Sequence, residues 1–287
     1  MKSSKHLILS ILLALACNNE VFAFKIIYTK ADSIKAEQIM QQASRQPKGT
    51  NLIKYIGQQF VGTPYVAQTL EVGKTENLVI NTSQLDCTTF VENVLALYLC
   101  VKEGKTHFAD FCHQIQTIRY ENGNVNYPSR LHYFSTWISS NTTKGIVKEV
   151  SSPNPPFSAQ QQINVYYMST HADKYPLLNG NAEYISKIKK AEQSINGTTC
   201  KYIPKKLLNK SKVLKKAVAD GDIIAIVTNK KGLDISHVGY ASWHKDGLHL
   251  MNASSIHHKV VDEPMTIYEY MQKHPSQTGI RIIRVKK

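Results

Sequence analysis

Three β-rich runs in the C-terminal third constrain the fold of this chain more than any other feature. They are GDIIAIVTN from residue 221, ISHVGYASW from residue 235 and LHLMNASS from residue 248. Only the short polar links KKGLD and HKDG separate them. This spacing of β-branched and aromatic runs predicts an antiparallel meander. The segment IRIIRV at residues 280–285 is predicted as a closing strand.

Helical periodicity dominates the first half of the chain. After Asp86, apolar side chains recur at the spacing of one helix face, which predicts a buried helix: Phe90, Val91, Val94, Leu95, Tyr98 and Leu99. Further helices are predicted at residues 30–46, 51–60 and 107–120. Helices followed by a sheet predict an α+β fold.

The middle of the chain, residues 139–220, is less regular. SSPNPP is predicted as a loop, INVYYMS as a strand and AEYISKIKKAEQSI as a helix. We find no internal repeat and no linker long enough to divide the chain. The sequence therefore predicts one domain over residues 24–287, with residues 139–220 as an insert.

The N-terminus has the features of an export signal. Lys2 and Lys5 precede the apolar run LILSILLALA, which is too short to cross a bilayer comfortably. Cleavage after VFA predicts a signal peptide over residues 1–23 and an exported, periplasmic protein. Alternatively, ALAC predicts lipid attachment at Cys17 and a membrane-anchored lipoprotein.

The chain is basic, with 35 Lys and Arg against 21 Asp and Glu and a net charge of +14. Ten lysines lie between Lys187 and Lys216, with Glu192 as the one acid. The simpler interpretation is a solvated surface, and the functional one is attraction to an anionic polymer such as cell wall. A nucleic-acid partner is not expected, because no binding motif accompanies the charge.

Four cysteines follow the leader: Cys87, Cys100, Cys112 and Cys200. If Cys87 and Cys100 share a helix, about 20 Å separates them, which is too far for a disulfide. Bridges between Cys100 and Cys112 or between Cys112 and Cys200 remain open. At least one thiol can therefore be free.

Cys87 has the context of a nucleophile. Asp86 is a favoured N-cap residue, and the unpaired N–H groups of the first helical turn lie near the thiol. The positive end of the helix dipole favours the thiolate, which is the reactive form. The alternative is that Cys87 is a small buried hydrophobic residue.

His237 has the best context for the base that such a cysteine requires. It begins the run SHVGYA, in which Gly239 and Ala241 leave room beside it. Asn252 on the next run can orient the imidazole across the hairpin, with His249 as the alternative. The odd spacing of these two residues means that His249 faces away if Asn252 faces the site.

Other chemistries lack their motifs. The chain has no G-x-S-x-G and no H-E-x-x-H, and neither GKT triplet has the first glycine of a phosphate loop. His257 and His258 are interpreted as a surface loop pair. No metal or organic cofactor is expected.

Several blocks of the sequence resemble a known family. They are GTPYV, ENLVIN, LDCTTFVENVLAL, IRYENGNVNYPSRLHYFSTWI, DGDIIAIVTNKKGLDISHVGYA and LMNASS. They resemble the exported N-acetylmuramoyl-L-alanine amidases of the NlpC-type, papain-like cell-wall hydrolases, from about Gln58 to the C-terminus. The resemblance implies a papain-like core in which a helix bearing the nucleophile packs on an antiparallel sheet, with helical insertions.

The resemblance also implies site residues. Cys87 would be the nucleophile, His237 the base and Asn252 the third, orienting residue, a position at which many relatives have histidine. Tyr65 matches a tyrosine that lines the cleft, although it can also be an ordinary packed aromatic.

Further residues are candidates for substrate binding. Arg130 could hold a carboxylate of the substrate, with His132 and Tyr133 beside it, or it could support a loop. Asp86 can contact a substrate ammonium in addition to capping the helix, and Ser236 can border the cleft.

The implied activity is hydrolysis of the amide between N-acetylmuramic acid and L-alanine, in peptidoglycan or soluble muropeptides, through a thioester. One alternative is an endopeptidase that cuts the stem peptide between D-glutamate and the diamino acid. Another is a wall-binding protein whose catalytic residues are inactive.

Overall fold

The computed structural model describes residues 24–152 and 154–286. The predicted signal peptide and Cys17 lie outside this part of the chain. The helices are α1 (Lys30–Ser44), α2 (Leu52–Gln58), α3 (Cys87–Lys102), α4 (Phe108–Arg119), α5 (Phe134–Thr143), α6 (Tyr167–Thr170), α7 (Ala182–Ile195), α8 (Ser211–Leu214) and α9 (Ile267–Gln272). None of these described helices is long and apolar enough to cross a membrane.

The strands form one large sheet and one small pair. They are β1 (Ile26–Ile27), β2 (Leu78–Val79), β3 (Val147–Val150), β4 (Ala159–Gln162), β5 (Thr199–Pro204), β6 (Ile223–Thr228), β7 (Ile235–Trp243), β8 (Leu248–Ser254), β9 (Lys259–Asp262) and β10 (Gln277–Val285). The large sheet has the order β4-β5-β10-β6-β7-β8-β9, and β3 also pairs with β10. All its pairs are antiparallel, whereas β1 and β2 pair in parallel.

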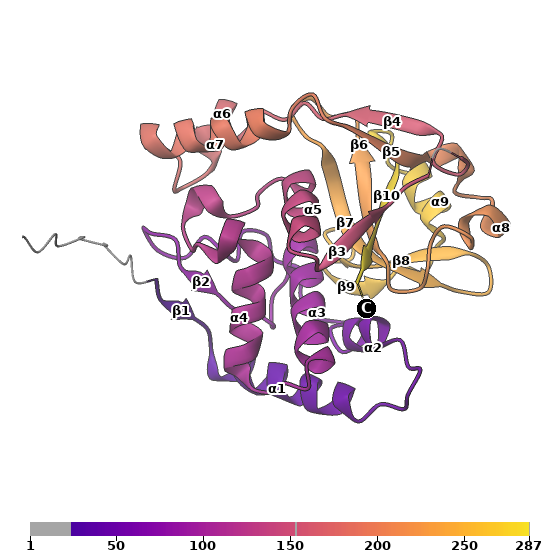
Figure 1. The fold of residues 1–287 in the computed structure, drawn as a ribbon, viewed down its shortest axis with the longest axis horizontal. Helices are drawn as coiled ribbons and strands as arrows, with labels where there is room; N and C mark the ends of the chain where they lie inside the picture. Colours follow the sequence, from indigo (N-terminus) through magenta and orange to yellow (C-terminus); the bar gives the residue numbers. More distant parts are fainter. Residues whose placement is uncertain (1–23, 153, 287) are drawn as a thin grey trace, which may run out of the picture.

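The predicted meander is confirmed as β6-β7-β8, and β9 extends it. Figure 1 shows α1 to α5 gathered on one side of this sheet and α8 and α9 on the other. The fold is therefore α+β, as the sequence predicts, with helices on both faces of the sheet.

Alternation along the strands explains the two layers. In β6, Ile223 and Ala225 join the core that contains α3, whereas Ile224 and Ile226 join the core that contains α9. Successive side chains of a strand point to opposite faces, so this fully buried strand supplies both cores.

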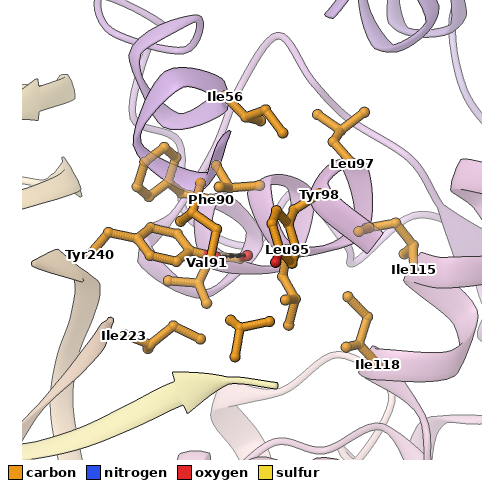
Figure 2. Packing of buried hydrophobic residues seen from close by; sticks show 14 of the residues in the cluster. Ile56, Phe90, Val91, Leu95, Leu97, Tyr98, Ile115, Ile118, Ile223 and Tyr240 are labelled. Carbon is orange, nitrogen blue, oxygen red and sulfur yellow. Dashed lines mark hydrogen bonds between the residues drawn. The ribbon is translucent and has the colours of Figure 1, made fainter. Parts of the chain in front are cut away.

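Helix α3 lies at the centre of the larger core. Figure 2 shows Phe90, Val91 and Leu95 packed between the other helices and the sheet. The Tyr240 hydroxyl on β7 donates a hydrogen bond to the Val91 carbonyl at 2.8 Å, which ties the helix to the strand. This packing fixes the helix end that carries Cys87.

One prediction for the middle of the chain needs correction. The segment predicted as a strand at residues 163–169 contains α6 instead, and the strand β4 ends just before it. Strands β3, β4 and β5 also lie within residues 139–220 and join the common sheet. Their pairing is with distant segments, and the sequence pattern does not show it. That this region is an insert of one domain stays a prediction.

The four cysteines in the described part of the chain are free. Cys87 and Cys100 both lie on α3, as predicted, and neither is in a disulfide. Cys112 and Cys200 are also free, so neither of the two open pairings has formed. Burial raises the pKa of Cys100 to about 12 and that of Cys112 to about 11, which keeps both thiols protonated.

Candidate active site

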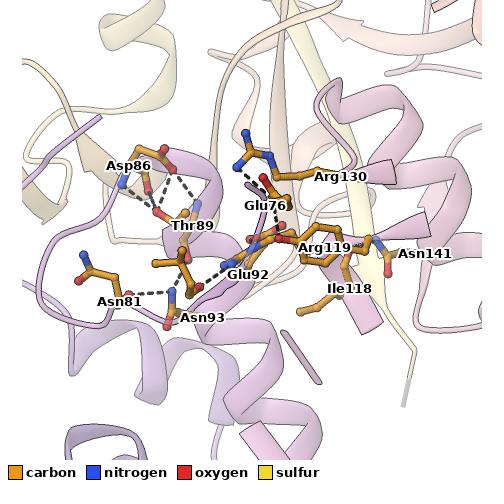
Figure 3. Close-up of polar contacts among 12 residues, drawn as sticks. Glu76, Asn81, Asp86, Thr89, Glu92, Asn93, Ile118, Arg119, Arg130 and Asn141 are labelled. Carbon is orange, nitrogen blue, oxygen red and sulfur yellow. Dashed lines mark hydrogen bonds and ion pairs between the residues drawn. The ribbon is translucent and has the colours of Figure 1, made fainter. Parts of the chain in front are cut away.

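The N-terminus of α3 presents Cys87 as its first helical residue. Asp86 is the N-cap, and its carboxylate accepts the backbone N–H of Thr89 at 2.8 Å, while the Thr89 hydroxyl accepts the Asp86 N–H at 2.9 Å (Figure 3). This reciprocal capping box starts the helix at the cysteine. No described residue accepts a hydrogen bond from the N–H of Cys87 or Thr88, so both donors remain available to an anion.

Strands β7 and β8 bring His237 and Asn252 together. His237 Nε2 lies 2.8 Å from Asn252 Oδ1. Gly239 permits this approach, because a Cβ there would lie 2.6 Å from the Met251 carbonyl and 2.9 Å from the Asn252 Cβ. The sequence predicted both the pairing across the hairpin and the room beside the imidazole.

The surroundings of His237 favour its charged form. Burial lowers the pKa of His237, but the charge and hydrogen bond of Cys87, the hydrogen bond of Asn252 and the charge of Glu263 together raise it above its ordinary value of 6.5. The cysteine therefore lies beside the imidazole, and the charges of a thiolate and an imidazolium would stabilise each other. Cys87 is half-buried, so a substrate can reach it.

Tyr65 lies close to Cys87 and Asp86. Burial raises the pKa of Tyr65, and the charges of Cys87 and Asp86 raise it further, so its hydroxyl stays protonated. Ser236 precedes the histidine and is half-buried, and its hydroxyl donates to the Ile226 carbonyl at 3.3 Å. Tyr65 and Asp86 thus gather around the cysteine, and Ser236 is adjacent in β7.

Arg130 and His132 line a hollow of about 180 Å³ next to Asp86. The Arg130 guanidinium is buried and paired with Glu71 and Glu76, and the latter pair is visible in Figure 3. His132 Nε2 lies 2.8 Å from the Tyr127 carbonyl, and burial together with the charge of Arg130 lowers the pKa of His132. Both side chains have protein partners, and both border the space beside Asp86.

Tyr133 belongs to a neighbouring cavity of about 430 Å³, against α7. Its hydroxyl donates to the Glu192 carboxylate at 2.7 Å and accepts the Met168 N–H at 2.9 Å. This side chain therefore fastens α7 and α6 to the rest of the protein. The two hollows share Arg130 and His132 in their walls.

One group among the described residues could hold a metal ion: His244, Asp246 and His249, at the far end of the β7–β8 hairpin. The two imidazoles stack with centroids 4.0 Å apart and planes 11° apart. A single ion cannot lie in both ring planes in this arrangement, as imidazole coordination requires. His249 also bonds the Glu263 carbonyl at 2.7 Å, so it faces away from His237, as the odd spacing predicted.

Sequence reasoning missed Glu263, whereas His257 and His258 are exposed, as predicted. Glu263 is 1% exposed and contacts both Asn252 and His257 at 3.2 Å. The β8–β9 hairpin brings them together, since Asn252 pairs with Val261. The only signal in the sequence is an acidic residue at the end of a β-rich run.

The fold and the site define an α+β protein in which a cysteine at a helix N-terminus lies beside a histidine–asparagine pair on an antiparallel sheet. The chain belongs to the N-acetylmuramoyl-L-alanine amidase-like family, also called AmiA-like, whose model matches residues 55–280. It is therefore a member of an amidase-like family of cell-wall hydrolases. No curated protein matches the sequence.

Solved structures share this fold, and one of those compared is named an N-acetylmuramoyl-L-alanine amidase. A Bacteroides uniformis N-acetylmuramoyl-L-alanine amidase is 36% identical with a TM-score of 0.76, covering 88% of this chain and 100% of its own. A Bacteroides fragilis protein, provisionally described as a xylanase, is 41% identical with a TM-score of 0.74, covering 80% of this chain and 98% of its own. A Legionella pneumophila protein at 24% identity has a TM-score of 0.67 over 91% of this chain and 97% of its own, and shows the shared fold alone.

Proposed function

We propose that this protein is a cysteine-dependent hydrolase that cleaves the amide between N-acetylmuramic acid and L-alanine in peptidoglycan or muropeptides. The observation that carries the proposal is the juxtaposition of a capped helix N-terminus bearing Cys87 with the hydrogen-bonded pair His237 and Asn252. We also propose a papain-like core of the NlpC type, which is supported by the placement of the cysteine on a helix N-terminus and of the histidine and its orienting residue on an antiparallel sheet.

The geometry suggests a thioester mechanism. His237 takes the proton of Cys87, and the thiolate attacks the carbonyl carbon of the lactyl group. The free N–H groups at the start of α3 stabilise the oxyanion of the tetrahedral intermediate. The imidazolium then protonates the departing amine as the C–N bond breaks, which leaves a thioester. Water attacks the thioester while His237 accepts its proton, and the carboxylic acid and the thiol are released.

The remaining predicted residues would shape the substrate site. Tyr65 and Asp86 border the nucleophile, so they would contact the groups on either side of the scissile amide. Arg130 and His132 would form the wall of the adjacent hollow, and in this proposal Arg130 acts through its paired carboxylates and not as a free clamp. Tyr133 would hold the far wall, and Ser236 would border the histidine.

A glycosidase mechanism finds less support in this structure. Glycoside hydrolysis ordinarily uses two carboxyl groups that flank the scissile bond. In the hollow beside Cys87, Glu71 and Glu92 are ion-paired with Arg130 and Arg119, respectively. Asp86 is engaged as the helix cap. We therefore do not propose for this protein the xylanase activity that the name of the Bacteroides fragilis relative describes.

Digestion of purified muropeptides followed by mass spectrometry tests the proposed bond. We expect the free amino sugar and the intact stem peptide, and no products from the Cys87→Ala variant. A cut stem peptide would favour the endopeptidase. No product from any muropeptide, with a folded protein, would favour a wall-binding protein with an inactive site.

The proposed substrate lies outside the cytoplasm, which supports export through the N-terminal segment. Determining the N-terminus of the mature protein tests this. A start at Phe24 fits the signal peptide, a lipid-modified Cys17 fits the lipoprotein, and an intact Met1 contradicts both.

A further inference from the structure

A buried carboxylate lies behind the histidine–asparagine pair. Glu263 follows β9 and is 1% exposed. One of its oxygens accepts a hydrogen bond from Asn252 Nδ2 at 3.2 Å, and the other lies 3.2 Å from His257 Nε2 at the surface. A buried ionised group is costly unless it is paired, so its position calls for an explanation.

The contacts of Asn252 determine how its amide is oriented. Its Nδ2 donates to the Leu250 carbonyl and to Glu263, both at 3.2 Å. A backbone carbonyl and a carboxylate only accept, so the NH₂ group must point toward them. The oxygen of the amide is therefore left for His237.

This orientation determines the tautomer of the histidine. Because Asn252 Oδ1 only accepts, His237 Nε2 must carry the hydrogen, at a distance of 2.8 Å. Nδ1 is then the nitrogen that remains free to take a proton from Cys87. The Leu250 carbonyl and Glu263 thus fix, through one amide, which nitrogen is free to act as the base.

We propose that Glu263 is a positioning residue for the reaction, which orients the Asn252 amide and stabilises the charged form of His237. It does not touch the substrate, and this role rests on the proposed function of Cys87 and His237. His257 closes the network at the surface, where it pairs with the carboxylate.

The charge of Glu263 acts at short range. The Asn252 amide alone separates the carboxylate from the imidazole, so the charge of Glu263 favours the charged form of His237 and helps to raise its pKa. The other titratable groups nearby are Cys87, Tyr65, His257 and Tyr270. Burial raises the pKa of Tyr270 to about 12, so that tyrosine stays neutral.

Alkylation of Cys87 by iodoacetate, measured across pH, isolates this effect without a wall substrate. A thiolate beside an imidazolium should give a bell-shaped profile, because the anionic reagent loses its attraction when His237 loses its proton. Mass spectrometry of the peptide that contains Cys87 separates it from the other cysteines. Glu263→Gln keeps the size and an acceptor oxygen but removes the charge.

A matched control exists at another buried carboxylate. Asp222 is 3% exposed and pairs with the partly exposed Arg284, as Glu263 pairs with His257. Asp222→Asn should therefore perturb folding similarly without moving the profile. His258→Gln is the corresponding control for His257→Gln, because the His258 side chain is exposed.

We expect Glu263→Gln to move the alkaline limb of the profile to lower pH, with both controls unchanged. Superimposable profiles for wild type and Glu263→Gln would overturn the positioning role alone. Wild-type Cys87 that reacts no faster than a free thiol peptide would overturn the proposed nucleophile and this role together. If Glu263→Gln does not fold, the second variant, His257→Gln, tests the network instead. The pKa of His237 is then measured by NMR titration in that variant. A pKa equal to that of the wild type would contradict the network.

Discussion

At the scale of single residues, the start of α3 assigns separate tasks to neighbouring groups. The Asp86 carboxylate accepts a hydrogen bond from the backbone N–H of Thr89 and so caps the helix. The N–H groups of Cys87 and Thr88 stay free of hydrogen bonds to the described residues. Cys87 can therefore sit beside free donors and beside His237. The raised pKa of His237 is the measurable consequence of that placement.

The pKa of His237 should fall when the cysteine loses its charge. In Cys87→Ser, the hydroxyl does not ionise, so the thiolate no longer opposes the effect of burial. NMR titration of the His237 ring should give a lower pKa in the variant than in wild type, with His132 as an internal control. An equal or higher pKa in the variant would mean that the two side chains do not interact.

The same shift has a consequence for stability. A histidine whose pKa is raised on folding stabilises the native state fully below its unfolded value of about 6.5, and this contribution is lost as the pH rises through the folded value. We therefore expect the difference in unfolding free energy between wild type and Cys87→Ser to change as the pH rises from about 6.5 through the folded pKa of His237. Denaturant unfolding at a series of pH values measures this difference.

At the scale of elements, the hairpin of β7 and β8 holds the base and its orienting residue. Gly239→Ala would place a Cβ within 2.6 Å of the Met251 carbonyl, so the strands would have to separate. We expect a loss of about 1–3 kcal/mol in unfolding free energy and a larger loss of activity.

Gly247→Ala is the matched control in the same hairpin. Its new Cβ would lie nearest to a methyl group of Thr266, at 3.1 Å, in the turn between β7 and β8. Denaturant unfolding and the muropeptide assay measure both effects. A Gly239→Ala protein with wild-type stability and activity would show that the close approach is not needed.

The core around α3 is expected to set the stability of the first layer. Leu95 is fully buried, so Leu95→Ala should lower the unfolding free energy by about 2–5 kcal/mol. Leu99 is half-buried, so Leu99→Ala should lower it by less. Chemical denaturation at fixed pH compares the two. Equal losses would contradict the packing shown in Figure 2.

At the scale of the whole molecule, the sequence predicted what local patterns encode. The periodicity of α3, the cap at Asp86 and the meander were all readable, and they place Cys87, His237 and Asn252. The strands β4 and β5 could not be predicted from the sequence. For example, β4 has the sequence AQQQ, which has no strand pattern, and it is a strand because it pairs with β5.

Long-range pairing also explains what else the sequence did not show. The predicted closing strand is β10, the last strand of the chain, but its place inside the sheet between β5 and β6 could not be predicted from local patterns. Glu263 was missed because its role depends on how the β8–β9 hairpin carries it back to Asn252. Arg130 was predicted from its sequence neighbours, which do not show that Glu71 and Glu76 would pair with it.

The most direct test of the central claim is to trap the covalent intermediate. Wild-type protein is mixed with a muropeptide, quenched in acid within the first turnovers, and digested for mass spectrometry. We predict a thioester on Cys87 that carries the N-acetylmuramic acid portion, with the stem peptide released. An adduct on another residue, a peptide fragment on Cys87, or full product formation by the Cys87→Ala variant would contradict the account.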